Sequence, residues 1–239
     1  MLRVVVCRLL LLAAAWVTAA CSSPGSVAGP PVTRAEALAI AEAYRTHEWV
    51  PTEANVKHGP DHQGILVNTP DVSYQKPGAV PGWWVPGQVN RGIPYQWGGF
   101  ATPAEFDAGI RAGLAAGDVY TLEKRRLLES AVSREATGID CSGFVSRCWK
   151  LSRAWSTREL ATLCDPLVSW DDLRPGDILN THNSHVALFA GWANPERTRL
   201  YTYETGVPPY WLVVRREVAT RHLQSLWFVP LRYRGMRDS

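Results

Sequence analysis

The sequence predicts an α+β fold, with helices first and an antiparallel sheet after them. Helix-capping motifs and helical spacing of apolar residues recur through the first part of the chain. From about residue 178 the pattern changes to short β-branched or aromatic runs separated by turns, which is typical of strands. We therefore expect the N-terminal helices to pack on a C-terminal antiparallel sheet.

Length and composition are those of an ordinary globular protein of one or two domains. The chain has 239 residues, of which 46% are hydrophobic, and a formal net charge of +3. Because this charge is small and no basic stripe is visible, we expect no nucleic-acid partner. No internal repeat is visible.

The first twenty residues have the pattern of an export signal. Basic residues flank the start, an apolar run covers Leu9 to Ala15, and small residues lead up to Cys21. The run is too short to span a bilayer. Residues 1–20 resemble a bacterial lipoprotein signal, although Thr18 stands where leucine is more usual. This interpretation makes Cys21 the lipidated first residue of an envelope protein, and simple secretion with cleavage nearby is the alternative.

Residues 21–32 are rich in Ser, Gly and Pro and predict a flexible tether. The folded domain is expected over 33–239. Thr33 and Glu36 form a capping box, which predicts a helix from Thr33 to about His47. The segment from Trp49 to Asn90 is broken by proline and glycine and is expected to hold loops and short strands, one of them at 64–67. Its adjacent Trp83 and Trp84 either cap the core or, if exposed, form a binding platform.

Two further helices are predicted before the middle of the chain. Thr102 to Glu105 is a capping box with proline at the first helical position, and its apolar face ends near Gly117. A second helical pattern, dense in charge, runs from Thr121 to about Val132. The simplest interpretation of the charged residues in this second pattern is that they form a solvent-exposed helix face.

The stretch from Gly138 to Val145 predicts a helix that begins at Cys141. The first backbone N–H groups of a helix lack intrahelical partners and carry partial positive charge, so a thiolate is stabilised there. Ser142 and Gly143 are small and leave room for a substrate beside the sulfur. The alternative is a buried cysteine that only packs.

The remaining elements are short. Ser156 to Glu159 caps a helix that ends near Cys164, and a turn covers Leu173 to Asp177. Strands are expected at 178–180, 185–192, 199–204, 211–218 and 226–233. Beyond Cys21, the chain has three cysteines, so at least one stays free or bonds to another chain. One arrangement pairs Cys148 with Cys164 and leaves Cys141 reactive.

A cysteine nucleophile needs a base and a third group that orients the base. His185 begins a predicted strand, and His182, three residues earlier, is the rival base. If the strands at 185–192 and 199–204 form an antiparallel hairpin, Glu204 falls nearer His185 than Thr202 does. We therefore expect Glu204 as the third group and keep Thr202 as the alternative.

His58 and His62 have a spacing that two metal ligands could use, but no cysteine or third histidine completes a site. We expect neither a metal nor another cofactor.

Four motifs together resemble the NlpC family of papain-like cell-wall cysteine peptidases. They are Ile93 to Gly99, Asp140 to Val145, Arg174 to Ile178 and His185 to Gly191. The resemblance covers roughly residues 92–233. It implies a papain-like fold, Cys141 as the nucleophile, His185 as the base, Tyr95 near the thiol, and peptidoglycan stem peptides as the usual substrate.

The sequence departs from the family pattern in two places. The glycine pair at Gly98 and Gly99 is separated from Cys141 by about forty residues, so we expect a helical insert at about 100–136. The third catalytic group is a carboxylate here, where the family often has His, Asn or Gln. A related acyl-transfer or amidase reaction on another substrate, and a non-catalytic binding module, therefore stay open.

Overall fold

The computed structural model describes residues 30–75, 81–206 and 211–238. The predicted signal, the lipidation site at Cys21 and most of the tether lie outside these ranges. Within them, no helix combines the length and the apolar character needed to cross a membrane.

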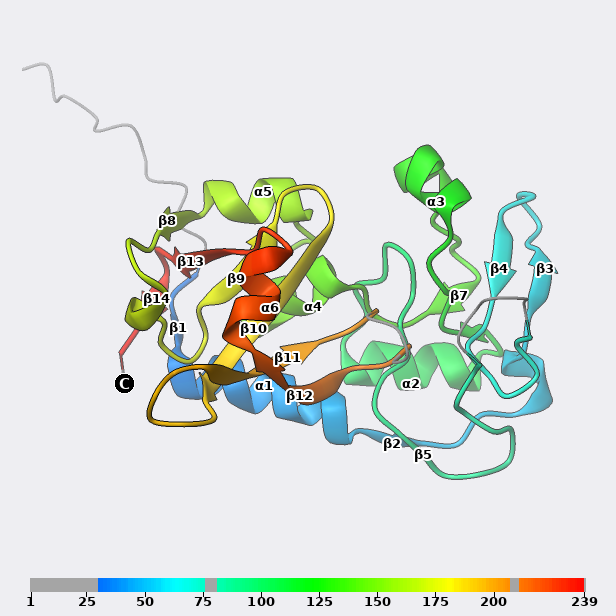
Figure 1. The fold of residues 1–239 in the computed structure, drawn as a ribbon. Coiled ribbons are helices and arrows are strands. Elements are labelled where there is room, and N and C mark those ends of the chain that lie inside the picture. Colours follow the sequence, from blue (N-terminus) through cyan, green and yellow to red (C-terminus); the bar gives the residue numbers. More distant parts are fainter. Residues whose placement is uncertain (1–29, 76–80, 207–210, 239) are drawn as a thin grey trace, which may run out of the picture.

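A six-stranded antiparallel sheet forms the C-terminal half, in the order β12-β11-β10-β9-β13-β8 (Figure 1). The strands are β8 (Cys164–Pro166), β9 (Ile178–Thr181), β10 (His185–Trp192), β11 (Arg199–Glu204), β12 (Val214–Ala219) and β13 (Val229–Tyr233). Helices precede this sheet, so the predicted α+β class is confirmed.

The last two predicted strands begin later than expected. Residues 211–213 pair elsewhere: the N–H of Val213 bonds the carbonyl of Ile93, and the N–H of Tyr95 bonds the carbonyl of Trp211. The strand predicted from Leu226 is wrong at its start, because α6 (Thr220–Ser225) occupies the connection and its last turn caps at Leu226.

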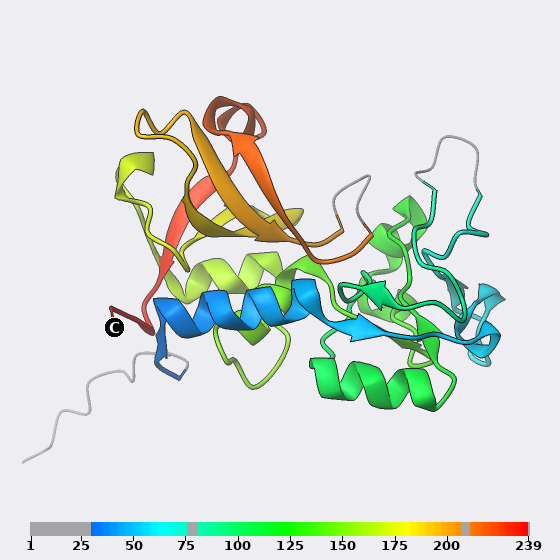
Figure 2. The same ribbon diagram turned by 90° about the horizontal axis from the view of Figure 1, so that it is seen from below.

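Both faces of the sheet are covered. Helices α1 (Arg34–Thr46) and α4 (Cys141–Cys148) lie against one face, and α6 lies at the other (Figures 1 and 2). Residues of β10 alternate between the two cores: Val186 and Leu188 join the α1–α4 side, and Phe189 joins a second cluster with Leu200 and Leu223. Helix α5 (Thr157–Thr162) packs beside α4 and β9.

The capping boxes predicted before α1, α2 (Pro103–Arg111) and α5 are all present. Small strand pairs complete the molecule. They are β1 (Val32–Thr33) with β14 (Met236–Arg237), β2 (Glu48–Trp49) with β5 (Asn90–Arg91), β3 (His58–Pro60) with β4 (Leu66–Asn68), and β6 (Ala115–Ala116) with β7 (Ala136–Thr137). Short 3-10 turns are η1 (Glu53–Asn55), η2 (Leu128–Ala131) and η3 (Trp170–Asp172).

Residues 101–138, which we call the insert, leave and rejoin the chain at one point, where Phe100 bridges Ile139. The insert holds α2, β6, α3 (Leu122–Leu127), η2 and β7 (Figure 1). Its second helix is shorter than predicted, because Leu128 has a φ of 52° and the chain continues as a 3-10 turn.

The structure decides two alternatives that the sequence left open. Cys148 and Cys164 are both buried free thiols, so the disulfide considered between them is absent. The Cys164 thiol lies 3.2 Å from the carbonyl of Leu160 instead. Trp84 is fully buried and Trp83 donates to the carbonyl of Trp211, so this pair belongs to the core and forms no exposed platform.

Candidate active site

Cys141 is the first residue of α4, as the sequence predicted. Asp140 caps the helix and accepts the N–H of Gly143 at 2.5 Å. The first turn of α4 lies directly on the glycine pair, because a Cβ at Gly143 would collide with the carbonyl of Gly99. The insert therefore does not separate the glycine motif from Cys141 in space. The Cys141 residue is partly exposed, so a substrate can reach it.

His185 begins β10 and is held between the thiol and a carboxylate. Its Nε2 lies 2.9 Å from Oε2 of Glu204, which leaves Nδ1 as the ring nitrogen for the thiol. Burial lowers the pKa of His185, but hydrogen bonds with Cys141 and Glu204 outweigh this and raise it to about 10. The surroundings of His185 thus favour the imidazolium form.

A β-bulge puts Glu204 on the same face of the sheet as His185. The register of β10 with β11 shifts between Phe189 and Gly191, so Leu188 faces Tyr203 and Ala187 is carried opposite Glu204. Without the extra residue Glu204 would fall opposite Leu188, on the other face, because a one-residue slip reverses every side chain.

Glu204 is buried, and its other oxygen is also occupied. Oε1 accepts the hydroxyl of Thr202 at 2.8 Å and Nε of Arg216 at 2.5 Å. Burial raises the pKa of Glu204, but His185 and Arg216 together lower it to about 2. Thr202 therefore positions Glu204, and it is Glu204 that contacts the imidazole.

Tyr95 lies near the thiol of Cys141. Its ring covers Gly206, where φ is +81° and any Cβ would collide with the ring. Burial raises the pKa of Tyr95 well above its usual value, and the Cys141 and Asp140 groups add to this effect. The phenol is therefore a neutral hydrogen-bond donor beside Cys141.

The rival base is placed less well. His182 is exposed in the turn between β9 and β10.

Two residues of the site were missed by the sequence reasoning. Asp140 carries a capping signal, since it directly precedes the helix. Arg216 carries none, because only the register that sets β12 beside β11 reveals that it reaches Glu204.

The two histidines considered for metal binding face separate carboxylates. Nε2 of His58 lies 2.9 Å from Asp71, and Nδ1 of His62 lies 2.6 Å from Glu135. Among residues 30–75, 81–206 and 211–238, no group of three or more His, Cys, Asp or Glu side chains is arranged to hold a metal ion.

Comparisons with family models, with curated proteins and with solved structures found no match to this chain. The chemistry of the site is therefore argued from its own geometry and from the motif resemblance.

Proposed function

We propose that the chain is a cysteine hydrolase with a papain-like, NlpC-type catalytic domain that cleaves an amide bond in peptidoglycan stem peptides. One observation carries the proposal. A half-buried imidazole at the start of β10 contacts a buried carboxylate through Nε2, and the partly exposed thiol of Cys141 helps to raise its pKa. A nucleophile, a base and an orienting group in this order form a cysteine triad.

Each residue has a defined step in the reaction. His185 holds the thiol proton, and the thiolate attacks the amide carbonyl. The backbone N–H of Cys141, at the positive end of α4, stabilises the oxyanion, and the Tyr95 hydroxyl donates to it; one such donor is worth about 10²–10³ in rate. The imidazolium then protonates the leaving amine, and water releases the acyl-enzyme. Glu204 keeps the ring oriented throughout.

The substrate class rests on the four motifs. The glycine pair, the Cys141 turn and the His185 strand, which lie apart in sequence, come together in space. A lipid anchor at Cys21 would place the enzyme at the membrane of the bacterial envelope, with the tether of residues 21–32 giving it reach. No nucleic acid, metal or cofactor takes part in the proposed reaction.

A second candidate is acyl transfer or amide hydrolysis on a substrate other than peptidoglycan. The insert favours it, because Asp118 of the insert donates its N–H to the carbonyl of Tyr95, so the insert forms part of the surroundings of the thiol. A non-catalytic binding module would need neither a reactive thiol nor a held imidazole.

Digestion of purified peptidoglycan tests the proposal. The wild-type protein should release stem-peptide fragments that mass spectrometry identifies, and the Cys141→Ser protein should release none. Labelling of Cys141 by a thiol-reactive probe without any peptidoglycan product would favour the second candidate. If the probe does not label Cys141 and no product is released, the non-catalytic binding module is the remaining candidate.

A further inference from the structure

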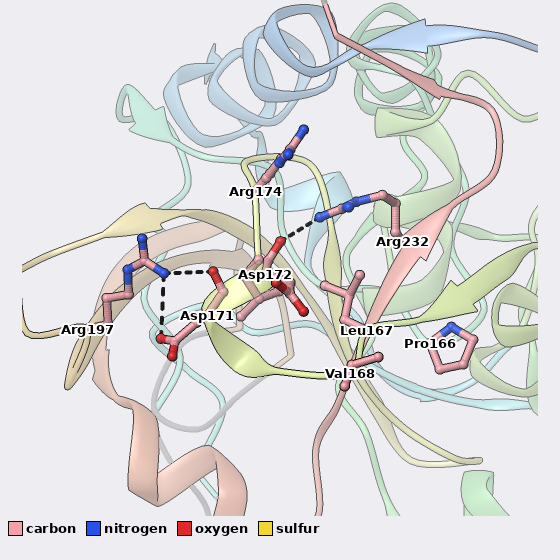
Figure 3. A pocket seen from close by; sticks show the side chains of 9 residues that line it. Pro166, Leu167, Val168, Asp171, Asp172, Arg174, Arg197 and Arg232 are labelled. Atoms are coloured by element: carbon pink, nitrogen blue, oxygen red, sulfur yellow. Dashed lines mark hydrogen bonds and ion pairs between the residues drawn. The ribbon is translucent and has the colours of Figure 1, made fainter.

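Two adjoining hollows lie at the end of the sheet opposite His185. The larger, of about 750 Å³, lies between η3, the β10–β11 turn and α6. The smaller, of about 450 Å³, extends it toward Arg232 of β13 (Figure 3). Both are lined by Val168, Asp171 and Arg197, so they form one groove, which we call the distal groove. Each hollow falls within the usual size of small-molecule sites.

Two tryptophans line the larger hollow. Trp170 and Trp192 are each half-buried there. Trp192 packs edge-on against the buried ring of Phe189, with centroids 5.3 Å apart, which restricts its orientation. A large, partly exposed ring that is fixed from behind offers a flat apolar surface for stacking.

The polar walls supply both donors and acceptors. Asp171 and Glu196 bring carboxylates, Arg221 a guanidinium and Gln224 an amide. The arginine of the turn is already paired, since Arg197 donates to the carbonyl of Asp171 at 2.8 Å. Three further arginines that line the groove are paired with carboxylates: Arg174 with Asp238, Arg199 with Glu217 and Arg232 with Asp177. An anionic ligand would have to compete with these carboxylates for the guanidinium groups, and an apolar ligand would leave the polar groups without water or partners.

Arg197, at the junction of the two hollows, is held in a strained backbone conformation. Its φ is 55°, which is uncommon for a residue with a side chain. Its carbonyl accepts the hydroxyl of Thr220 at 2.9 Å, and its guanidinium lies 5.6 Å from the Trp192 ring (Figure 3 shows its contact with Asp171). Strain of this kind concentrates at ligand-binding positions.

We propose that the distal groove binds a neutral oligosaccharide, whose rings stack on Trp170 and Trp192 and whose hydroxyls bond the polar walls. A polyhydroxylated ring uses donors and acceptors together and has apolar faces. The eight residues of β10 set the groove about 23 Å from His185, at about 3.3 Å per residue. The saccharide site stands without the hydrolase; only the identification of its ligand with wall glycan rests on the proposed function.

Calorimetric titration of the full chain tests the site with two probes, a tetramer of N-acetylglucosamine and a tetramer of glucose. We expect binding of at least one, and tighter binding of the first if wall glycan is the natural ligand. Trp192→Ala and Arg197→Gly should each weaken binding tenfold or more. Glycine adopts the positive φ without strain, so Arg197→Gly removes the guanidinium and keeps the turn even if Trp192→Ala unfolds.

Trp227→Ala is the matched control, because Trp227 is 85% exposed and does not line the groove. Its affinity should equal that of the wild type. Failure of both tetramers to bind at millimolar concentration, or equal affinity of wild type and Arg197→Gly, overturns the site. Cleavage of a sugar-free stem peptide by the wild type is measured separately, so the hydrolase and the saccharide site can fail independently.

Discussion

Glu204 and Asp118 are both buried carboxylates beside basic side chains, and the protein treats them in opposite ways. Glu204 is 2% exposed and Asp118 is fully buried. The pKa of Glu204 falls to about 2 because His185 and Arg216 outweigh burial. The pKa of Asp118 rises to about 6 because burial outweighs the attraction of Lys124.

The difference follows from the number of partners. Glu204 has two basic partners and a hydroxyl. Asp118 has one basic partner, the Lys124 ammonium at 2.6 Å, which also donates to the carbonyl of Leu66; its other partner is the neutral backbone N–H of Asn68. Glu204 therefore stays ionised beside the imidazole of His185. The Asp118–Lys124 pair instead connects the insert to β4. Breaking the first pair should alter chemistry, and breaking the second should alter stability.

Replacing the nucleophile should have the largest effect. Cys141→Ser should lower the rate of stem-peptide hydrolysis by about 10³-fold or more, since a hydroxyl in this setting is a far weaker nucleophile than a thiolate. The melting temperature should change little, because the Cys141 residue is partly exposed at a helix end. Hydrolysis that survives this change would falsify the assignment of Cys141.

Breaking the Asp118 pair should destabilise the fold. Lys124→Met leaves a buried carboxylate without its cation, which costs about 3–5 kcal/mol. Denaturant unfolding measures the loss, and the activity per folded molecule should stay near that of the wild type. The folded pKa of Asp118 lies above its unfolded value of 3.8 and rises further in this variant, so the loss should be small at pH 5 and larger at pH 8.

The matched variant removes both charges. Asp118→Leu combined with Lys124→Met should be clearly more stable than Lys124→Met alone, because no uncompensated charge is left. Additive losses in the double variant would show that packing, and not charge, accounts for the effect.

Local signals explain what the sequence could predict. The Thr33–Glu36 capping box marked the start of α1, and β-branched or aromatic runs separated by turns predicted β10 and β11 with their observed bounds. Helix α6 was missed because Ala219 before it makes no side-chain cap. At the site, the Cys141 helix start and the His185 strand start are local features, and so they were predictable.

Long-range register was not predictable. The bulge near Gly191 decides which face of β11 meets His185, and nothing local to Glu204 reveals it. The partner of Arg216 depends on the same register carried across one more strand. The hairpin argument placed Glu204 near His185 by position along the strand, and the bulge then supplied the face.

Neutralising the orienting carboxylate should have a moderate effect. Glu204→Gln keeps a hydrogen-bonding group but loses the charge, so hydrolysis should slow by about 10- to 100-fold, the worth of a charged hydrogen bond. The pKa of His185 is raised to about 10 partly by Glu204, so the basic limb of the pH–rate profile should move to lower pH. Thr202→Val should do much less. A crippling Thr202→Val beside a neutral Glu204→Gln would transfer the orienting role to Thr202.

The smallest effect should come from Arg216, and its sign separates it from Glu204. The Arg216 guanidinium and the His185 ring bind the same Glu204 carboxylate. The guanidinium partly neutralises the negative charge that stabilises the imidazolium, and it also repels the imidazolium directly. Arg216→Met should therefore move the basic limb to higher pH, opposite to Glu204→Gln, with a rate change below about tenfold. Arg215→Met is the matched control, because Arg215, the neighbour of Arg216 on β12, lies over the Tyr201 ring, 3.8 Å from its centroid. The Arg215 profile should coincide with that of the wild type. A shift of the basic limb to lower pH in Arg216→Met would mean that the guanidinium mainly holds the Glu204 carboxylate in place. Without that hold, the contact between Glu204 and His185 weakens, which has the same effect on the pKa of His185 as neutralising Glu204.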